Sequence, residues 1–332
     1  MSLKVARLCV CLMLLSLSAA STTAQSLKAE KVSCLGNQSC YKLSNGTVEV
    51  VVTTEVGPRI MRYGFVGADN LLAELPVDPA GAKADTFKVW GGHRLWAAPE
   101  SMPRTYAPDN RPVEVKLDTN SIRLIAPVEA QTGIQKEMLV TLDAEGTGVT
   151  VLHRITNRGT AVVELAPWGL TIMNAGGVAI MPQEPFRPHD GNALLPVRTM
   201  ALWAYTNLSD PRWTVGEKFI RLRPEAAHKE SQKLGAANRQ GWMAYHRAGT
   251  LFVKRFDYKD GAAYPDMGSN AELYAKGAFI EIETLAPLER LEQNAAAEHI
   301  ERWFLFRDVK MGATEASIEQ TLAPLIKQTA LK

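Results

Sequence analysis

The sequence predicts an all-β protein, a large antiparallel β-sandwich with one helix on its surface near the C-terminus. Three observations lead to this class. Short β-branched segments recur along most of the chain, turns rich in Gly, Pro and Asn separate them, and helical periodicity is clear only near the C-terminal end. Long series of strands joined by polar turns are typical of antiparallel sandwiches. The 332 residues are enough to bury a large core.

The first clear strand is the β-branched run TVEVVVTT at 47–54, which lies between the turn signals Asn45-Gly46 and Gly57-Pro58. The sequence Asn157-Arg158-Gly159 predicts a hairpin, because these residue types tolerate the left-handed backbone of tight turns. Further predicted strands are VEVKLD (113–118), SIRLIAP (121–127), GVTVLHRITN (148–157), TAVVELAPW (160–168), WMAYHR (242–247), LFVKRFDY (251–258), AFIEIETL (278–285) and ERWFLF (301–306).

The C-terminal segment predicts an amphipathic helix. Ile318, Leu322, Leu325 and Ile326 recur at helical spacing and form one apolar stripe. The chain shows no fixed-period repeat and no clear linker, so one domain from about residue 30 to 330 is the simplest organisation. The middle of the chain, 176–239, is rich in loops, which predicts either a binding surface or surface decoration.

The first 24 residues resemble a secretory signal peptide. Lys4 and Arg7 precede an apolar run at 8–17, and small residues follow. We expect cleavage after Ala24, with Ala20 as the alternative. The apolar run is too short to span a bilayer comfortably, so the sequence predicts no membrane span and a periplasmic or secreted mature protein.

Charge and motifs exclude several functional classes. The full chain has 37 basic and 35 acidic residues, and loss of Lys4 and Arg7 would balance the two. Such a balance gives no electrostatic footprint for nucleic acid. No metalloprotease, EF-hand, nucleotide-loop or G-x-S-x-G motif occurs, so no metal or cofactor is predicted. The oligomeric state is not predicted.

Cys34 and Cys40 stand in CLGNQSC and remain after removal of the signal segment. An oxidising compartment favours a disulfide between them. Closing so short a loop would add about 2 kcal/mol of stability. Metal binding is the alternative, but two thiols without neighbouring histidines make a poor site.

The segment GGHRLWAAPE at 91–100 concentrates candidate site residues. His93 can donate or accept a hydrogen bond near neutral pH, Arg94 can bind vicinal hydroxyls, and Trp96 offers a face for a pyranose ring. Glu100 is a candidate partner for them. In an extended strand His93 faces away from Arg94 and Trp96, so all of them share one surface only if the segment bends.

The segment GAFIEIETL places Glu281 and Glu283 on the same face of one strand, about 7 Å apart. Adjacent carboxylates raise the pKa of one of them and can provide a base, and Glu283 is the preferred candidate. The alternative is an ordinary solvent-facing strand. His189, in FRPHDG, is a further candidate for substrate binding because Pro188 stiffens its polar loop.

Four segments together resemble the galactose-mutarotase-like supersandwich, in particular an exported bacterial group with that fold. They are LSNGTVEVVVTTEVGPRIMRYGFVGADNLL, GGHRLWAAPE, TNRGTAVVELAPWGLTIM and GAFIEIETLAPLERLEQNAAAEHIERWFLF. The resemblance implies a many-stranded antiparallel β-supersandwich whose concave face binds carbohydrate. Aldose mutarotases carry a histidine in a central strand, but the comparable strand here, APWGLTIMN, has Trp168 and Asn174 instead.

These observations lead to one main hypothesis and several alternatives. The main hypothesis is an exported carbohydrate-binding protein that binds a mono- or oligosaccharide in a concave cleft. The candidate substrate-binding residues are Arg94, Trp96, Glu100, Trp168, Asn174, His189 and Glu281. The first alternative is an aldose 1-epimerase with Glu283 as base and His93 as acid. A polysaccharide lyase or hydrolase, and a non-catalytic structural envelope protein, are the others.

Overall fold

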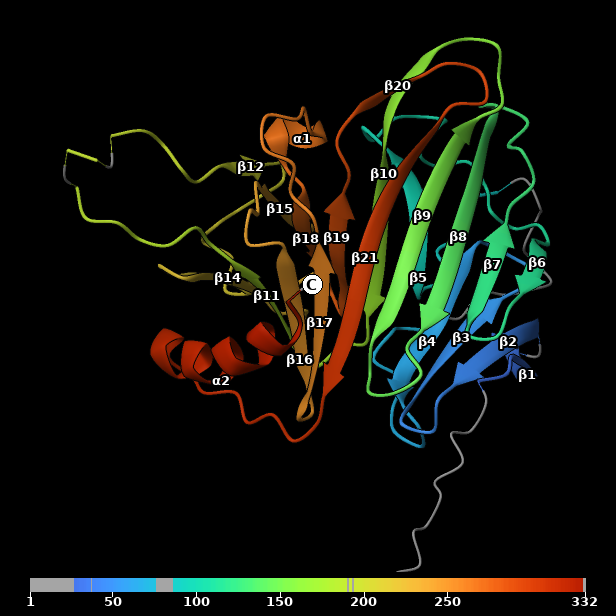
Figure 1. Cartoon of the computed structure of the whole chain (residues 1–332). Coiled ribbons are helices and arrows are strands. Elements are labelled where there is room, and N and C mark those ends of the chain that lie inside the picture. Colours follow the sequence, from blue (N-terminus) through green and yellow to red (C-terminus); the bar gives the residue numbers. More distant parts are fainter. Residues whose placement is uncertain (1–26, 37, 76–85, 190, 193, 331–332) are drawn as a thin grey trace, which may run out of the picture.

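The computed structural model describes residues 27–36, 38–75, 86–189, 191–192 and 194–330. Two large antiparallel sheets face each other across a shared core, as Figure 1 shows. The all-β prediction is therefore confirmed. The signal segment, residues 1–24, lies outside the described residues. No helix in the described ranges has the length and apolar character that a membrane crossing needs.

The first sheet has the strand order β1-β2-β3-β4-β5-β10-β19-β18-β15-β12, and β20 pairs with the far end of β10. Because the order is β5-β10-β19-β18, β5 and β19, which are nearly 200 residues apart in sequence, are separated by only one strand. The bounds are β1 Glu30–Cys34, β2 Gln38–Ser44, β3 Val48–Thr53, β4 Arg59–Phe65, β5 His93–Ala98, β10 Val163–Met173, β12 Met200–Leu202, β15 Gln232–Ala236, β18 Ala271–Lys276, β19 Phe279–Leu285 and β20 Glu289–Leu291.

The second sheet has the order β13-β14-β11-β16-β17-β21-β9-β8-β7-β6. Its strands β8 and β21 alternate strictly between buried and more exposed residues, and β9 does so up to its buried last three residues, as expected for a sheet with one face on the core. The bounds are β6 Glu114–Leu117, β7 Ser121–Ile125, β8 Ile134–Leu142, β9 Val149–Asn157, β11 Val178–Pro182, β13 Trp213–Val215, β14 Phe219–Leu222, β16 Trp242–Arg247, β17 Thr250–Phe256 and β21 Ala296–Phe306.

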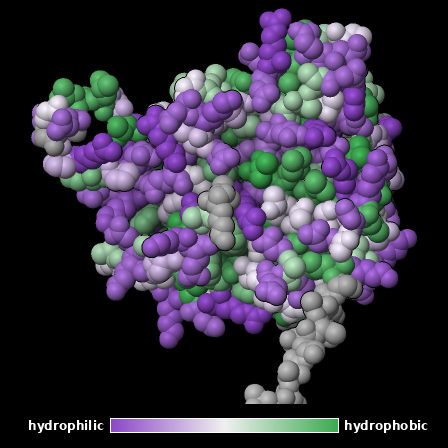
Figure 2. All heavy atoms as spheres, in the orientation of Figure 1, coloured by the Kyte–Doolittle hydropathy of each residue, from purple (hydrophilic) through white to green (hydrophobic). Residues whose placement is uncertain are grey.

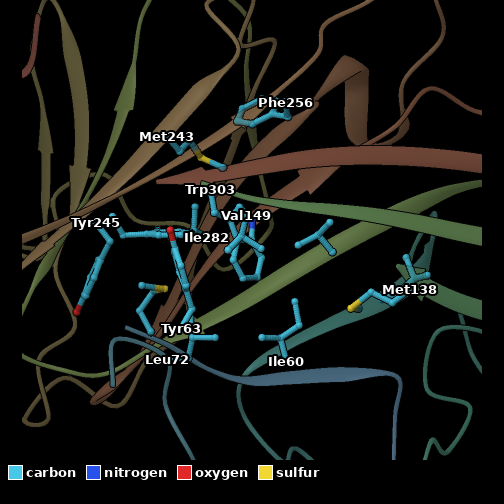
Figure 3. Packing of buried hydrophobic residues seen from close by; sticks show 14 of the residues in the cluster. Ile60, Tyr63, Leu72, Met138, Val149, Met243, Tyr245, Phe256, Ile282 and Trp303 are labelled. Atoms are coloured by element: carbon cyan, nitrogen blue, oxygen red, sulfur yellow. The ribbon is translucent and has the colours of Figure 1, made fainter. Parts of the chain in front are cut away.

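The main hydrophobic core fills the space between the sheets. Figure 3 shows Ile60 and Ile282 from the first sheet packed with Met138, Phe256 and Trp303 from the second. Alternation along each strand sends one set of side chains into this core and the other set outward. For β5, β10 and β19 the outward set is also buried, so these strands carry buried residues on both faces.

The predicted C-terminal helix is confirmed as α2, Glu315–Gln328. Thr314 caps it by accepting a hydrogen bond from the backbone of Ser317. Ile318 and Leu322 pack on the outer face of the second sheet against residues of β11, β14, β16 and β17. The helix lies beside β16 at the lower left of Figure 1 and leaves the outer face of the first sheet to other segments.

The hairpin predicted at Asn157-Arg158-Gly159 is wrong. Strand β9 pairs with β8 and β21 in the second sheet, whereas β10 pairs with β5, β19 and β20 in the first. The segment therefore crosses between the sheets. The side chain of Asn157 holds this crossing by donating to the carbonyls of Ala161 and Leu291. The residue types indicated correctly that the strand ends here, but not which strands the segment joins.

The paired glycines before β5 permit a close approach of backbones. Gly91 and Gly92 both have positive φ, at 92° and 66°. A Cβ atom on Gly92 would lie 2.3 Å from the carbonyl oxygen of Ile60, and one on Gly91 would lie 2.2 Å from that of Ala73. No other residue type fits there without a shift of the chain. The glycines thereby fix where β5 enters the first sheet.

Cys34 and Cys40 form a disulfide with 6.0 Å between their Cα atoms, linking β1 to β2. The loop-rich middle of the chain includes an excursion between β11 and β12 that projects from the body (Figure 1). Figure 2 shows a mostly hydrophilic surface with apolar residues gathered on this excursion, where Phe186, Leu194 and Leu195 are well exposed.

Candidate functional site

A cluster of charged and aromatic side chains lies on the outer face of the first sheet. Residues that face each other across neighbouring strands share one side of a sheet. Strand pairing aligns Arg94 of β5 with Leu170 of β10, Leu170 with Glu283 of β19, and Glu283 with Glu272 of β18. Trp96 faces Trp168 in the next row. We call this group, with Glu281 and Lys233, the outer cluster.

Lys233 of β15 is the central cation of the outer cluster. Its ammonium lies 3.0 Å from Glu283 Oε2 and 2.8 Å from Glu272 Oε2. The ring centroids of Trp168 and Trp203 lie 4.5 and 4.7 Å from it. Two carboxylates and two aromatic faces therefore compensate one buried charge. The indole of Trp168 also donates to Glu283 Oε2 at 3.0 Å.

Arg94 forms the other end of the outer cluster. Its Nη2 donates to Glu281 Oε1 at 3.2 Å. The guanidinium carbon lies 4.0 Å from the ring centroid of Trp96, which is a stacking contact. The Trp96 ring in turn meets the edge of Trp168, with 5.4 Å between centroids. The two tryptophans thus form an aromatic floor beneath the charged groups.

Several buried polar atoms of the outer cluster have no hydrogen-bond partner within the described part of the chain. They are Nε and Nη1 of Arg94 and Oε1 of Glu272. Oε2 of Glu272 is matched by the ammonium of Lys233, 2.8 Å away. Buried groups of this kind are usually satisfied in a folded protein, so each one calls for an explanation. One explanation is that these atoms bind a ligand that supplies both donors and acceptors.

Burial shifts the ionisation of the outer cluster. It raises the pKa of Glu281 to about 7, with Arg94 acting against the rise and Glu283 adding to it. Burial also raises the pKa of Glu272 well above its usual value, although Lys233 opposes this. For Lys233, burial lowers the pKa, but Glu272 and Glu283 outweigh it and the net shift is upward. Glu281 therefore populates both protonation states near neutral pH.

Loops from several parts of the chain cover the outer cluster. Phe87 and Tyr106 pack on Trp96, with centroids 5.6 and 5.1 Å away. Asp266, in the short turn α1, Pro265–Gly268, has a left-handed φ of 50°, and Met267 follows at 60°. Such conformations cost non-glycine residues about 1–3 kcal/mol and are common at functional sites. The contacts of Phe87 and Tyr106 with Trp96 thus place loop residues over the outer cluster.

The predicted site residues divide into those that meet and those that do not. Arg94, Trp96, Trp168, Glu281 and Glu283 come together on the outer face, as their strand alternation predicts.

His93 does not join them, because β5 stays extended and the imidazole points into the core, against His153 and Trp303. The hypothesis that His93 acts as the acid on a sugar shared with Glu283 therefore has no geometric support.

The remaining candidates lie at the margin of the outer cluster or beyond it. Glu100 is exposed and accepts a hydrogen bond from the hydroxyl of Tyr106. Asn174 donates to the carbonyls of Asn70 and Leu72, and it lines a hollow of about 500 Å³ at the end of β10. His189 is exposed on the projecting excursion.

Sequence reasoning missed Lys233 and Glu272. Glu272 and Tyr274 alternate with Leu273 and Ala275 in AELYAK, so the period-two signal was present. The local pattern does not contain the order of strands in the sheet, and only that order places β18 beside β19. Lys233 lies in a five-residue strand within the loop-rich middle, where no motif marks it.

One group of side chains within the described residues has ligand atoms close enough for a metal ion, namely His93, His153 and Glu301. It lies on the inner side of β5, between the sheets, and is separate from the outer cluster.

No family model matches this chain, and no curated protein is similar to it in sequence. Among solved structures, it is similar to a proposed mutarotase from Salmonella typhimurium, with a TM-score of 0.56 and 12% identity over 85% of this chain and 94% of that one. It is also similar to a galactose mutarotase-like protein from Lactobacillus casei, with a TM-score of 0.54 and 11% identity over 80% and 100%.

A third similar structure is a TPR-domain containing protein from Parabacteroides distasonis, with a TM-score of 0.52 and 13% identity. The alignment covers 84% of this chain but only 49% of that one, so this chain spans about half its length. At these identities the likeness defines the fold and not the reaction. The chain has the galactose-mutarotase-like fold, as its sequence resemblance implied.

Proposed function

We propose that this protein is exported and binds a carbohydrate over the outer cluster. The observation that carries the proposal is the set of unmatched polar atoms above an aromatic floor. Arg94 offers free donors, Glu272 offers its Oε1 atom, and Trp96 and Trp168 lie beneath or beside them. A sugar supplies hydroxyls that both donate and accept, together with a C–H face that packs on aromatic rings. The fold of the similar structures supports the same ligand class.

Calorimetric titration with a broad panel of mono- and oligosaccharides tests the proposal. We expect saturable binding, and we expect Arg94→Gln to weaken it at least tenfold because the variant loses the guanidinium fork. Arg123→Gln is the matched control, since Arg123 also pairs with a glutamate, Glu137, but lies on the second sheet. Absence of binding across the panel, or equal loss in both variants, would count against a sugar site here.

A second candidate function is sugar epimerisation, favoured by the raised pKa of Glu281. Mutarotation needs one group to take the proton of the anomeric hydroxyl and another to protonate the ring oxygen. Glu281, with a pKa of about 7, exists in both forms near neutral pH, and Glu283 is its neighbour on the same face. In this version Glu283 remains the candidate base and Glu281 replaces His93 as the acid.

Polarimetry of freshly dissolved α-aldoses distinguishes catalysis from binding alone. An epimerase accelerates the relaxation, and both Glu281→Gln and Glu283→Gln abolish the acceleration. Relaxation at the uncatalysed rate for every aldose that binds would leave a binding protein only.

Export is supported by the signal-like residues 1–24 and by the disulfide between Cys34 and Cys40, which suits an oxidising compartment. Mass spectrometry of the protein expressed in a bacterium with its full N-terminus is the test. We expect a mature chain that begins at Gln25 in the periplasmic or medium fraction. An unprocessed chain that stays in the cell would contradict export.

A further inference from the structure

A second buried polar cluster lies directly beneath the candidate site, between the two sheets. His93 of β5, Thr171 of β10 and Thr284 of β19 contribute to it from the first sheet. The second sheet contributes Lys254 of β17, His153 of β9, and His299 and Glu301 of β21, and all seven side chains are buried. We call these seven residues the inner cluster.

Hydrogen-bond partners fix the protons along one branch of the inner cluster. Nδ1 of His153 lies 3.0 Å from the carbonyl oxygen of His299, which can only accept, so Nδ1 carries the proton. In a neutral ring Nε2 of His153 then accepts, and Nε2 of His93 donates to it at 2.6 Å. Nδ1 of His93 therefore accepts from the hydroxyl of Thr171 at 2.8 Å, and that oxygen accepts from Lys254 at 2.6 Å.

The second branch closes the network. The hydroxyl of Thr284 donates to Glu301 Oε1, so its oxygen accepts from Nε2 of His299 at 2.7 Å. Lys254 donates to the same carboxylate oxygen at 3.0 Å and to the carbonyl of Ile282 at 3.3 Å. Among the described residues, no fully buried side-chain atom of the inner cluster lacks a hydrogen-bond partner. The outer cluster differs in this respect.

The charges of the inner cluster also balance. Lys254 and Glu301 form one ion pair, and the three histidines are neutral in this arrangement. Burial lowers the pKa of His93 and His153, and it lowers that of His299 to about 3. For Glu301, burial raises the pKa, but Lys254 and the histidines outweigh it and the net shift is downward. An added positive charge would have no counter-ion here.

A metal ion fits this geometry poorly. Two tetrahedral ligands that are each about 2.0–2.1 Å from zinc lie about 3.3 Å apart. The Nε2 atoms of His93 and His153 are only 2.6 Å apart, which is the separation of a donor and an acceptor that share a proton. A divalent cation beside Lys254 would also leave excess positive charge in the core. The distances therefore favour a proton over a metal.

We propose that the inner cluster is a metal-free positioning network that holds β5, β10 and β19 in place for ligand binding on their outer faces. His93 precedes Arg94 in the chain, and Thr284 follows Glu283, so these two anchored residues are each adjacent to a residue of the outer cluster. This part of the inference rests on the proposed function. The protonation pattern does not.

Nuclear magnetic resonance of protein labelled with ¹⁵N-histidine tests the pattern directly. Long-range ¹H–¹⁵N spectra at pH 7 should show the proton on Nε2 of His93, on Nδ1 of His153 and on Nε2 of His299, with residue-specific assignment through single His→Gln variants. Addition of one equivalent of ZnCl₂ should leave these signals unchanged. A doubly protonated ring, or zinc binding that removes the proton between His93 and His153, would overturn the proposal.

The positioning role is tested with Thr171→Val, which removes the hydroxyl between Lys254 and His93 but keeps the shape of the side chain. We expect the sugar dissociation constant to rise about tenfold, and Thr171→Ser to restore it, because serine replaces the hydroxyl. Thr156→Val is the control, since Thr156 is buried on β9 away from the site. If Thr171→Val does not fold, Thr284→Val removes the hydroxyl of the other branch.

An unchanged dissociation constant in a folded Thr171→Val protein would show that the network supports stability alone and would overturn the positioning role. A wild-type protein that binds no saccharide removes that role together with the proposed function. In that case the spectra still decide whether the protonation pattern is correct.

Discussion

The outer and inner clusters lie on opposite faces of the same three strands and differ in how completely their charges and hydrogen bonds are matched. The inner cluster joins Lys254, Glu301 and three histidines in one network, and among the described residues none of its fully buried side-chain atoms lacks a hydrogen-bond partner. The outer cluster gathers more carboxylates than cations and leaves atoms of Arg94 and Glu272 unmatched. Both are buried, so exposure to solvent does not explain the difference.

This comparison distinguishes groups that stabilise the fold from groups that are available to bind a ligand. A matched buried network stabilises one arrangement of the chain, and its members cannot easily be removed one at a time. An unmatched buried group weakens the fold and is retained where it serves a function. Similar residue types on the two faces of one strand can therefore have opposite effects when mutated.

The largest expected effect is on the inner cluster. Glu301→Gln leaves Lys254 buried without its counter-ion, which typically costs about 3–5 kcal/mol of unfolding free energy. Equilibrium unfolding in urea measures this loss. The double variant Lys254→Met/Glu301→Gln should recover part of it, because neither charge then remains. A loss below about 1 kcal/mol in the single variant would show that the pair is not buried and matched as described.

On the outer cluster, Arg94→Met should have the opposite pattern of effects: little loss of stability but loss of sugar binding. The guanidinium leaves with its two unmatched nitrogens, and Glu281, whose pKa is about 7, can take up a proton. We expect the unfolding free energy to change by less than about 1 kcal/mol while sugar binding is lost. Urea unfolding and calorimetry on the same preparation measure both. A loss as large as that of Glu301→Gln would erase the distinction between the clusters.

The two clusters should respond to pH with opposite signs. Burial lowers the folded-state pKa of His299 from 6.5 to about 3, so its contribution to stability is present above pH 6.5 and is lost as the pH falls toward 3. Burial raises the folded-state pKa of Glu281 from 4.5 to about 7, so its contribution is present below pH 4.5 and is lost as the pH rises through 7.

Measuring the unfolding free energy of two variants as a function of pH isolates the contributions of His299 and Glu281. Between pH 4.5 and 6.5, stability of the wild type should fall more steeply with decreasing pH than that of His299→Gln, by up to about 1.4 kcal/mol per pH unit. Glu281→Gln should change the slope in the other direction. Unfolding in urea at half-unit pH steps gives the slopes, and changes of the same sign in both variants would contradict the assignments.

The smallest effect is expected at the rim of the outer cluster. Glu100 is exposed and contacts Tyr106, which packs on Trp96. Glu100→Gln should leave stability unchanged within about 0.5 kcal/mol and weaken sugar binding about twofold to threefold. A loss of binding as complete as that of Arg94→Met would move Glu100 from the rim into the centre of the site.

The sequence predicted most strands, the terminal helix and the all-β class, because alternation and β-branched runs are local signals; the particular fold was implied by the resemblance of four segments. Alternation also predicted that Glu281 and Glu283 share a face and that His93 opposes Arg94. It did not predict the pairing of strands far apart in the chain. The tight-turn residues at 157–159 indicated a hairpin, but the chain crosses between the sheets there.

The same limit explains the residues that were missed. Lys233 and Glu272 belong to the site only because β18 and β15 follow β19 in the first sheet. His153, His299 and Glu301 form a network with His93 only because the two sheets face each other. These relationships depend on the fold as a whole and have no short motif in the sequence.

A crystal structure of the protein soaked with a saccharide that binds in solution tests the central claim most directly. We predict a sugar ring on the outer cluster, within hydrogen-bonding distance of Nε or Nη1 of Arg94 and of Oε1 of Glu272, with the inner cluster unchanged beneath it. A sugar bound elsewhere, or Arg94 and Glu272 fully matched by protein groups in the unliganded crystal, would contradict the account.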